Sequence, residues 1–302
     1  MEKSNEKFAQ LWHYYEKHLP NLESALREHL PLAPPKIETQ FNEAIEYALF
    51  SGGKRLRPVL TLLGAELVGG NPALMAPSAV AVEFIHTSSL IFDDLPCMDN
   101  ALERRGKTAL HAKFGEGLAI LVGLGFLNAA YPLVFVNHSG QPERAMQAHA
   151  EIVECVGASG MVGGQSVDLA LAKSAGGDDP TDDNFDFESI RNLKTSALMR
   201  LALRVGAILA GASYIELAQL SRFAELLGDA YQLSDDLIDL EEDDGIFEQN
   251  KTFAINRGVG SAQLQLNNLV EEAKRILIEN FPSNEARSCL VQLTEYLAER
   301  KT

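Results

Sequence analysis

Three aspartates and two adjacent arginines stand close together in the stretch IFDDLPCMDNALERRGK, which runs from Ile91 to Lys107. Asp93, Asp94 and Asp99 carry carboxylate oxygens, the hard ligands that suit Mg²⁺. This ion usually takes one or two protein carboxylates and completes its octahedron with water and phosphate oxygens. The stretch therefore has two interpretations, a cluster of ion pairs or a metal-bridged anion.

A second group of aspartates lies in the stretch SDDLIDL. Asp235 and Asp239 are four residues apart and share one face of a helix, and Asp236 is three residues from Asp239. Like charges at this spacing destabilise a helix by about 0.2–0.5 kcal/mol per pair unless a cation lies between them. An isolated acidic triplet is usually a solvated helix face, but both groups lie within apolar sequence. Together they indicate several Mg²⁺ ions around one polyphosphate.

Basic residues follow two glycines in the stretch SGGKRLRPVL. Lys54 is a mobile positive charge and Arg57 a bidentate fork, so the two can clamp a diphosphate. Pro58 is suited to the first position of the next helix, whose free N–H groups attract anions. The nucleotide-binding pattern GxxxxGK[ST] is absent, and an ordinary surface loop is the alternative.

The elements that must position these residues are predicted to be helices. Apolar residues recur at helical spacing from Leu220 to Ile238 and again from Leu269 to Leu277, whereas alternating strand patterns are missing. Pro96 should interrupt the helix that carries the first aspartates and let Asp99 return toward them. The breaks between helices have the length of loops, so we expect one all-α domain over residues 1–302.

Composition excludes several classes of protein. The chain has 302 residues, of which 42 are acidic and 26 basic, and its formal charge of −16 argues against nucleic acid or anionic membrane as a partner. Three cysteines without metal-ligand spacing favour a reducing cytoplasm. The N-terminus lacks the apolar segment of a signal peptide, and no stable membrane insertion is expected. Glycines and a proline interrupt the apolar segment Leu118 to Val136, which we interpret as one or two buried helices.

Five motifs, in this order and at these separations, resemble those of the trans-prenyl diphosphate synthases, the family of farnesyl and geranylgeranyl diphosphate synthases. They are GGKRLRP, EFIHTSSLIFDDLPCMDNALERRGK, GGQSVDL, LKTSALM and YQLSDDLID. The resemblance covers about Phe41 to Arg257. It implies an all-α bundle of about ten or more helices around a central apolar cavity, and it suggests a homodimer.

The resemblance also implies a Mg²⁺-dependent prenyltransferase that condenses isopentenyl diphosphate with an allylic diphosphate. The product would be farnesyl diphosphate or a slightly longer chain. Three Mg²⁺ ions would be bound by two groups of aspartates, namely Asp93, Asp94 and Asp99, and Asp235, Asp236 and Asp239. The residues expected to be catalytic are Asp93, Asp94, Asp99, Arg104, Lys194 and Asp235.

Further residues carry over to the two substrates. The allylic diphosphate is expected to contact Arg104, Lys194 and Lys251, and isopentenyl diphosphate Lys54, Arg57, His86 and Arg105. A lone histidine in apolar sequence is usually a core residue, but His86 stands seven residues before the first aspartate. A helix broken near Lys194 would let Thr195 and Gln232 turn oxygen dipoles toward the allylic cation. Ser88 and Ser89, at the positions that line the floor of the chain pocket in this family, are small and favour a longer product.

Two other hypotheses remain. A non-catalytic partner subunit or prenyl diphosphate binder is motivated by two departures from the family pattern, Leu124 and a short loop after Asp239, while the altered residues 100–103 bear on the rate. A terpene cyclase is the third hypothesis. It needs no isopentenyl pocket and would leave Lys54, Arg57 and Arg105 unexplained.

Overall fold

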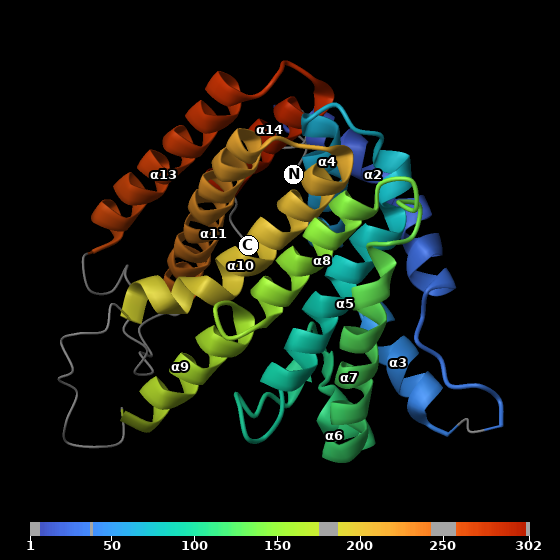
Figure 1. Ribbon diagram of the computed structural model, residues 1–302. Helices are drawn as coiled ribbons and strands as arrows, with labels where there is room; N and C mark the ends of the chain where they lie inside the picture. The colour runs from blue at the N-terminus through green and yellow to red at the C-terminus, as the bar shows by residue number, and fades with distance from the viewer. Residues whose placement is uncertain (1–6, 37–38, 175–186, 243–257, 300–302) are drawn as a thin grey trace.

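Long helices dominate the computed structural model, which describes residues 7–36, 39–174, 187–242 and 258–299 (Figure 1). The side chains of residues 171–174, 187–195 and 239–242 lie outside the description. The helices are α2 (Ala9–Glu28), α3 (Phe41–Phe50), α4 (Leu56–Leu67), the 3₁₀ turn η1 (Pro72–Met75), α5 (Ala76–Asp93), α6 (Leu110–Phe114), α7 (Glu116–Leu133), α8 (Pro142–Val156), α9 (Met161–Ser174), α10 (Phe187–Ala210), α11 (Tyr214–Glu242), α13 (Val259–Asn280) and α14 (Glu285–Glu299). The predicted all-α bundle of about ten or more helices is confirmed.

The central contact of the bundle joins α4 and α10, whose backbones approach closely at two glycines. A Cβ on Gly64 would lie 2.2 Å from the carbonyl oxygen of Leu203, and one on Gly206 would lie 1.9 Å from that of Thr61. Any larger residue would force the two helices apart, and tightly packed cores resist such changes. Helix α10 thereby becomes a fixed support for the elements around it.

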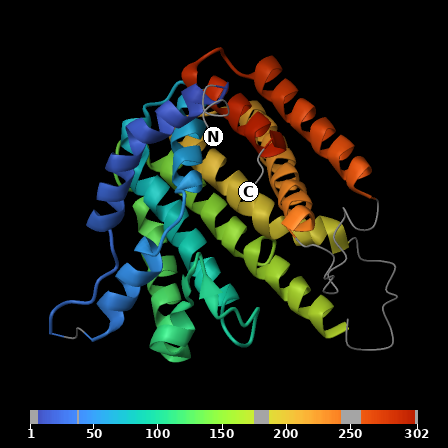
Figure 2. The same cartoon turned by 180° about the vertical axis from the view of Figure 1, so that it is seen from behind.

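Helices α5 and α11 run in the same direction on either side of this support. Both pack against α10, and both descend from the upper to the lower end of the bundle (Figure 1; the view from behind in Figure 2 agrees). Asp93 is the last residue of α5, and Asp235 and Asp236 lie in the last third of α11. The two groups of aspartates therefore lie toward the same end of the molecule.

Several boundaries confirm the sequence patterns. The apolar repeats around Leu227 and Ala273 lie on α11 and α13. Helix α5 ends before Pro96, and the backbone N–H of Asp99 donates to the carbonyl oxygen of Asp93 at 2.9 Å. The chain thus turns back toward the first aspartates, as predicted.

Other predictions were wrong. Helix α4 starts at Leu56, so Pro58 is its third residue, because Arg55 adopts a left-handed conformation (φ 49°) and caps the helix. Helix α10 continues without interruption across residues 194–195, although it changes direction near its N-terminal end (Figure 1). A short hairpin of β1 (Glu103–Arg104) and β2 (Lys107–Thr108), pairing Arg104 with Lys107, was not foreseen.

The apolar segment after Leu118 also differs from its interpretation as buried. It forms one helix, α7, and only 33% of its 18 residues, Glu116–Leu133, are buried inside the fold. Within the described residues, this stretch and Pro72–Asp93 are long and apolar enough to cross a bilayer, and 83% of the latter's window is buried. Pro72–Asp93 is therefore a core segment, whereas α7 presents an apolar face to the outside.

Candidate active site

A cavity of about 790 Å³ lies between α2, α4, α5, α11 and α14. Its polar wall contains Lys54, Arg57, His86 and Arg105, the four residues assigned to isopentenyl diphosphate. The facing wall is largely aromatic and apolar, with Trp12, Tyr15, Met199, Tyr231, Leu293 and Tyr296. The structure thus gathers residues from distant parts of the chain around one space that is cationic on one side.

His86 holds the two nearest guanidinium groups. Arg57 Nη1 lies 3.0 Å and Arg105 Nη2 3.4 Å from His86 Nε2. A guanidinium can only donate, so Nε2 accepts and the ring proton is on Nδ1. Burial lowers the pKa of His86 well below its ordinary value, and the charges of Arg57 and Arg105 lower it further. His86 is therefore a neutral acceptor that turns two cations toward the cavity.

Some polar atoms of this wall lack partners within the described residues. Arg57 Nε and His86 Nδ1 are buried and make no hydrogen bond there. Burial also lowers the pKa of Arg57, so its positive charge is poorly compensated. A half-buried guanidinium whose Nε has no acceptor is stabilised by an anion that supplies both charge and acceptor oxygens. The cavity therefore has the chemistry of a site for a multivalent anion.

A buried ion-pair network that was missed from the sequence holds the cationic loop. Arg55, 5% exposed, donates from Nε to Glu23 Oε1 and from Nη1 to Glu83 Oε1, both at 2.8 Å. Its Nη2 donates to the carbonyl oxygen of Leu49 at 2.7 Å. Arg55 thus connects α2, α3 and α5 to the start of α4. It stands in the sequence between Lys54 and Arg57, so these bonds also fix the backbone that carries both residues. A bulky residue with positive φ is uncommon, and these three bonds hold it in place.

Glu83 is the counter-charge of the whole group. It is 2% exposed, pairs directly with Arg55 and acts electrostatically on Arg57 and Arg105. Its position three residues before His86 in the motif EFIH puts both side chains on one face of α5. This spacing was the sequence signal that could have linked Glu83 to His86. A glutamate in apolar sequence, however, could equally be a metal ligand or the partner of a buried cation.

Replacing this counter-charge should destabilise the fold strongly. We expect Glu83→Gln to lower the free energy of unfolding by about 3–5 kcal/mol, because it leaves Arg55 buried with one partner fewer. The matched control is Glu272→Gln, which breaks the exposed pair of Glu272 with Arg222 and should cost about 0–1 kcal/mol. Urea unfolding measures both values. Equal losses in the two variants would contradict the role of Glu83.

The neutral state of His86 predicts a dependence of stability on pH. The unfolded chain protonates this histidine below its ordinary pKa of about 6.5, whereas the folded chain holds the pKa lower. Stability is therefore full above about pH 6.5 and falls as the pH drops toward 5. We expect the loss between pH 7.5 and 5.5, measured by urea unfolding, to be smaller in His86→Gln. An unchanged loss in this variant would refute the assignment.

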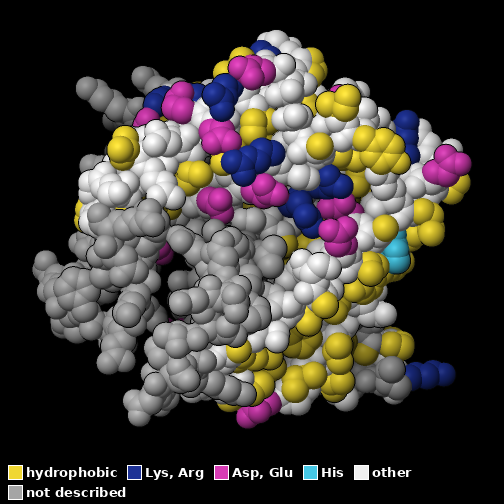
Figure 3. Space-filling model, turned by 60° about the vertical axis from the view of Figure 1, so that its left-hand side comes forward, with side chains coloured by type: hydrophobic (Ala, Val, Ile, Leu, Met, Phe, Trp, Pro, Cys, Tyr) yellow, Lys and Arg dark blue, Asp and Glu magenta, His cyan; other side chains and the backbone are white. Residues whose placement is uncertain are grey.

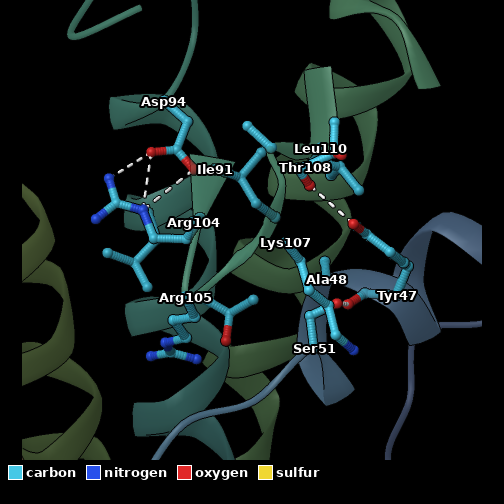
Figure 4. Close-up of a pocket in the computed structure, with 13 residues that line it drawn as sticks. Tyr47, Ala48, Ser51, Ile91, Asp94, Arg104, Arg105, Lys107, Thr108 and Leu110 are labelled. Atoms are coloured by element: carbon cyan, nitrogen blue, oxygen red, sulfur yellow. Dashed lines mark hydrogen bonds and ion pairs between the residues drawn. The ribbon is translucent and has the colours of Figure 1, made fainter. Parts of the chain in front are cut away.

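The first group of aspartates lies where α5 ends. Asp93 and Asp94 are 8% and 4% exposed. Arg104 from β1 donates from Nε to both carboxylate oxygens of Asp94, at 3.0 and 3.3 Å, and Nη2 makes a further contact (Figure 4). This pairing raises the pKa of Arg104. The buried carboxylate of Asp94 is thereby compensated by a fork that is itself half exposed.

The hairpin divides the two adjacent arginines between two sites. Arg104 reaches Asp94 (Figure 4), whereas Arg105 donates from Nη1 to the carbonyl oxygen of Gly52 at 2.6 Å and contacts His86. Tyr47 anchors the hairpin by donating to the carbonyl oxygen of Thr108 at 2.8 Å. The left-handed φ angle of Arg105 (55°) makes the turn that separates the two side chains.

The glycine pair before Lys54 makes room for Arg105. A Cβ on Gly53 would lie 2.5 Å from Arg105 Nη1, and Gly53 has a φ of +126°. Gly52, which accepts from Arg105, has a φ of +118°. Both positions have backbone conformations that favour glycine. The motif GGKRLRP is thus explained by the approach of an arginine from the hairpin.

The residue types at this end fit Mg²⁺, but the complete ligand set lies partly outside the described residues. Asp93, Asp94 and Asp99 offer hard carboxylate oxygens, and Asp235 and Asp236 are half-buried on α11. Within the described part of the chain, no three residues of metal-ligand type form one group. Arg104 occupies the oxygens of Asp94 that a metal would use. The magnesium ligands therefore stay a prediction.

Several predicted residues cannot be placed. The side chains of Lys194, Thr195 and Asp239 and all of Lys251 lie outside the described residues. Gln232 is half-buried on α11, one turn before Asp235 and Asp236. It thus faces the same side of the helix as the aspartates.

A second cavity of about 360 Å³ extends from Asp93 between α5, α7 and α9. Ser88 and Ser89 line it beside Phe92, Met98, Leu127, Val156, Met161 and Leu169. Both hydroxyls donate to the carbonyl oxygen three residues earlier at 2.8 Å, so their hydrogen-bonding needs are met within α5. Apart from Asp93 at its acidic end and Gln165 and Ser166 of α9, the rest of the lining is apolar, so the cavity can hold a hydrocarbon chain.

Comparisons with known proteins show the family and the fold of the chain. A family model described as polyprenyl synthetase matches residues 38–284. Geranylgeranyl diphosphate synthase of Cyanophora paradoxa is 38% identical over 267 residues, 85% of this chain and 86% of that protein. A solved FPP/GFPP synthase from Zymomonas mobilis matches with a TM-score of 0.83 at 29% identity, over 96% of this chain and 99% of the other.

Plant relatives are longer than this chain. Geranylgeranyl pyrophosphate synthase 7, chloroplastic, of Arabidopsis thaliana is 42% identical over 202 residues, which are 67% of this chain. The match spans 57% of that protein, and 58–61% of two similar Arabidopsis proteins.

Proposed function

Because this chain belongs to the polyprenyl synthetase family, we propose that it is a Mg²⁺-dependent prenyltransferase that joins isopentenyl diphosphate to an allylic diphosphate. One observation supports this most directly. His86, which contacts Arg57 and Arg105 of the cationic wall, lies two helical turns before the buried aspartates at the end of α5, and a largely apolar cavity extends from those aspartates. The three parts suit two diphosphates and one growing hydrocarbon chain.

Isopentenyl diphosphate is assigned to the 790 Å³ cavity. Lys54 and the forks of Arg57 and Arg105 would bind its phosphate oxygens, while neutral His86 keeps both forks in position. The buried Nε of Arg57 would gain an acceptor. A terpene cyclase would have no use for this second anion site, which counts against that hypothesis.

The allylic diphosphate is assigned to the acidic end of α5. Mg²⁺ held by the two groups of aspartates would neutralise the departing diphosphate and so favour ionisation of its carbon–oxygen bond. Arg104, half exposed on its hairpin, can donate to phosphate oxygens in place of Asp94. The apolar lining around Ser88 and Ser89 would keep water from the allylic cation. The diphosphate itself would accept the proton that the condensation releases.

The product is assigned to the range from farnesyl to geranylgeranyl diphosphate. Ser88 and Ser89 are small residues in the lining of the 360 Å³ cavity and leave room for a longer chain. The Cyanophora relative is named for the geranylgeranyl product, which supports the longer chain. Location in the cytoplasm stays a prediction, since the Arabidopsis relatives are named chloroplastic.

Turnover tests the proposal directly. We expect the protein to convert isopentenyl and geranyl diphosphates to longer prenyl diphosphates when Mg²⁺ is present, as measured by chromatography of radiolabelled product. Asp93→Asn should lower kcat about 100-fold or more, the usual loss for one electrostatic group at a reacting centre. Its helical circular dichroism should stay unchanged. The control Glu143→Gln changes an exposed acid on α8 and should keep full activity.

Absence of product at every Mg²⁺ concentration would defeat the enzyme hypothesis. Co-purification with a heterologous synthase would then favour the non-catalytic partner subunit. One of its motives is weakened by the structure, because Leu124 lies on the exposed face of α7 and lines neither cavity.

We further propose that a second copy of the chain covers the exposed face of α7. Figure 3 shows hydrophobic side chains gathered in a band low on one face of the molecule. The exposed apolar side chains on neighbouring helices are Ile120, Leu121 and Leu124 of α7, Met146 and Val153 of α8, and Val162 of α9. Residues 117–133 carry no charge, so two chains of charge −16 can meet there without strong repulsion. A two-fold axis would pair this face with itself.

Charges on this face should separate the subunits. We expect the double variant Leu121→Glu, Leu124→Glu to sediment as a monomer where the wild type sediments as a dimer, because four like charges would meet at the two-fold axis. Leu264→Glu on α13, at a site 62% exposed, is the control and should remain dimeric. Sedimentation velocity distinguishes the species. A monomeric wild type, or a dimeric double variant, would disprove this interface.

A further inference from the structure

Phe92 forms a wall of the 360 Å³ apolar cavity, immediately before Asp93. Its ring lies against α7 at Gly123, which has no side chain to meet it. A Cβ at that position would lie 2.7 Å from Phe92 Cζ, 2.9 Å from Cε1 and 3.2 Å from Cε2. The outer edge of the ring therefore occupies the space that any other residue would fill.

We propose that Gly123 is a specificity-determining residue that sets the length of the prenyl chain by letting the Phe92 ring withdraw against α7. This inference rests on the proposed function. It assigns no chemistry to Gly123, which touches neither aspartate group. The glycine acts through Phe92, and Phe92 borders the space into which the chain grows.

The direction of the effect follows from what can move. Helices α5 and α7 make one of the most extensive contacts in the fold, and Phe84 and Phe126 stack between them with ring centroids 5.1 Å apart. Val122, next to Gly123, is fully buried. Separating the helices would disrupt this packing, whereas the Phe92 ring can rotate about its side-chain torsions. The open side of the ring is the cavity, so a methyl group at 123 should push the ring inward.

An inward shift of an aromatic ring narrows an apolar pocket without changing its charge. The cation wall around His86 and the carboxylates at the end of α5 are untouched by a substitution on α7. Binding of both diphosphates should therefore persist, while long chains meet the displaced ring. The expected change is in the distribution of products rather than in the chemistry of condensation.

The neighbouring Gly125 provides a matched control. It lies on the same helix, and a Cβ there would meet Phe41 Cζ at 3.1 Å. Phe41 lines neither the 790 Å³ nor the 360 Å³ cavity. Gly125→Ala therefore repeats the chemical change, and a similar crowding of a phenylalanine, without acting on the pocket.

The experiment compares product chain lengths from isopentenyl and geranyl diphosphates for five proteins: wild type, Gly123→Ala, Gly125→Ala, Phe92→Ala and the double variant Phe92→Ala, Gly123→Ala. We expect Gly123→Ala to shorten the main product by one isoprene unit and Gly125→Ala to leave it unchanged. Phe92→Ala should lengthen it by at least one unit, and adding Gly123→Ala to Phe92→Ala should have no further effect.

Three results would overturn the inference: a folded Gly123→Ala with wild-type products, a shortening that persists when Phe92 is alanine, or no lengthening in Phe92→Ala. The product length of Phe92→Ala tests the inference even if Gly123→Ala does not fold. A wild type without turnover would refute the proposed function instead. Calorimetric titration with geranyl and geranylgeranyl diphosphates would then test the inference. Gly123→Ala should weaken the binding of the longer ligand only, and an equal loss of affinity for both ligands would overturn it.

Discussion

The site depends on holding three guanidinium groups beside one another, of which Arg55 is buried, Arg57 half-buried and Arg105 exposed. Arg55, Arg57 and Arg105 converge on α5, and a cation removed from water is costly unless it is paired. Glu83 supplies a buried carboxylate that acts on all three, and His86 adds a neutral acceptor in place of a fourth charge. The positive charge of Arg57 is only partly compensated, because its buried Nε has no hydrogen-bond partner within the described residues. An anionic substrate can therefore supply the negative charge and the hydrogen-bond acceptor that Arg57 lacks.

The remainder of the fold serves this arrangement by fixing where helices begin and end. Close contact between α4 and α10 at Gly64 and Gly206 places the cationic loop, which starts α4, against α5. The end of α5 at Asp93 then releases the chain into the turn and hairpin that bring back Arg104 and Arg105. One helix thus carries the counter-charge, the acceptor and the acidic end, and its rigidity sets the spacing between two diphosphate sites.

Sequence patterns were sufficient for the helices and for much of the cation wall. Helical periodicity is a property of each segment alone, and Lys54, Arg57, His86 and Arg105 were identified through motifs that occur together. The partners Arg55, Glu83 and Glu23 were missed because their roles depend on which helices meet. Arg55 stands within the same motif as Lys54, yet nothing local distinguishes a side chain that points inward from one that points to the cavity.

Two of the wrong predictions, the start of α4 and the burial of α7, concern features that depend on how the helices pack together. The start of α4 was misplaced because proline is compatible with several positions of a first turn, and only the tertiary bonds of Arg55 stabilise the left-handed cap before Leu56. Helix α7 was taken as buried because its composition is that of a core helix. An apolar face that a second subunit would cover has the same composition as one covered by the chain's own helices. Hydrophobicity thus shows that a surface needs a partner, and only the arrangement of helices shows whether the same chain supplies it.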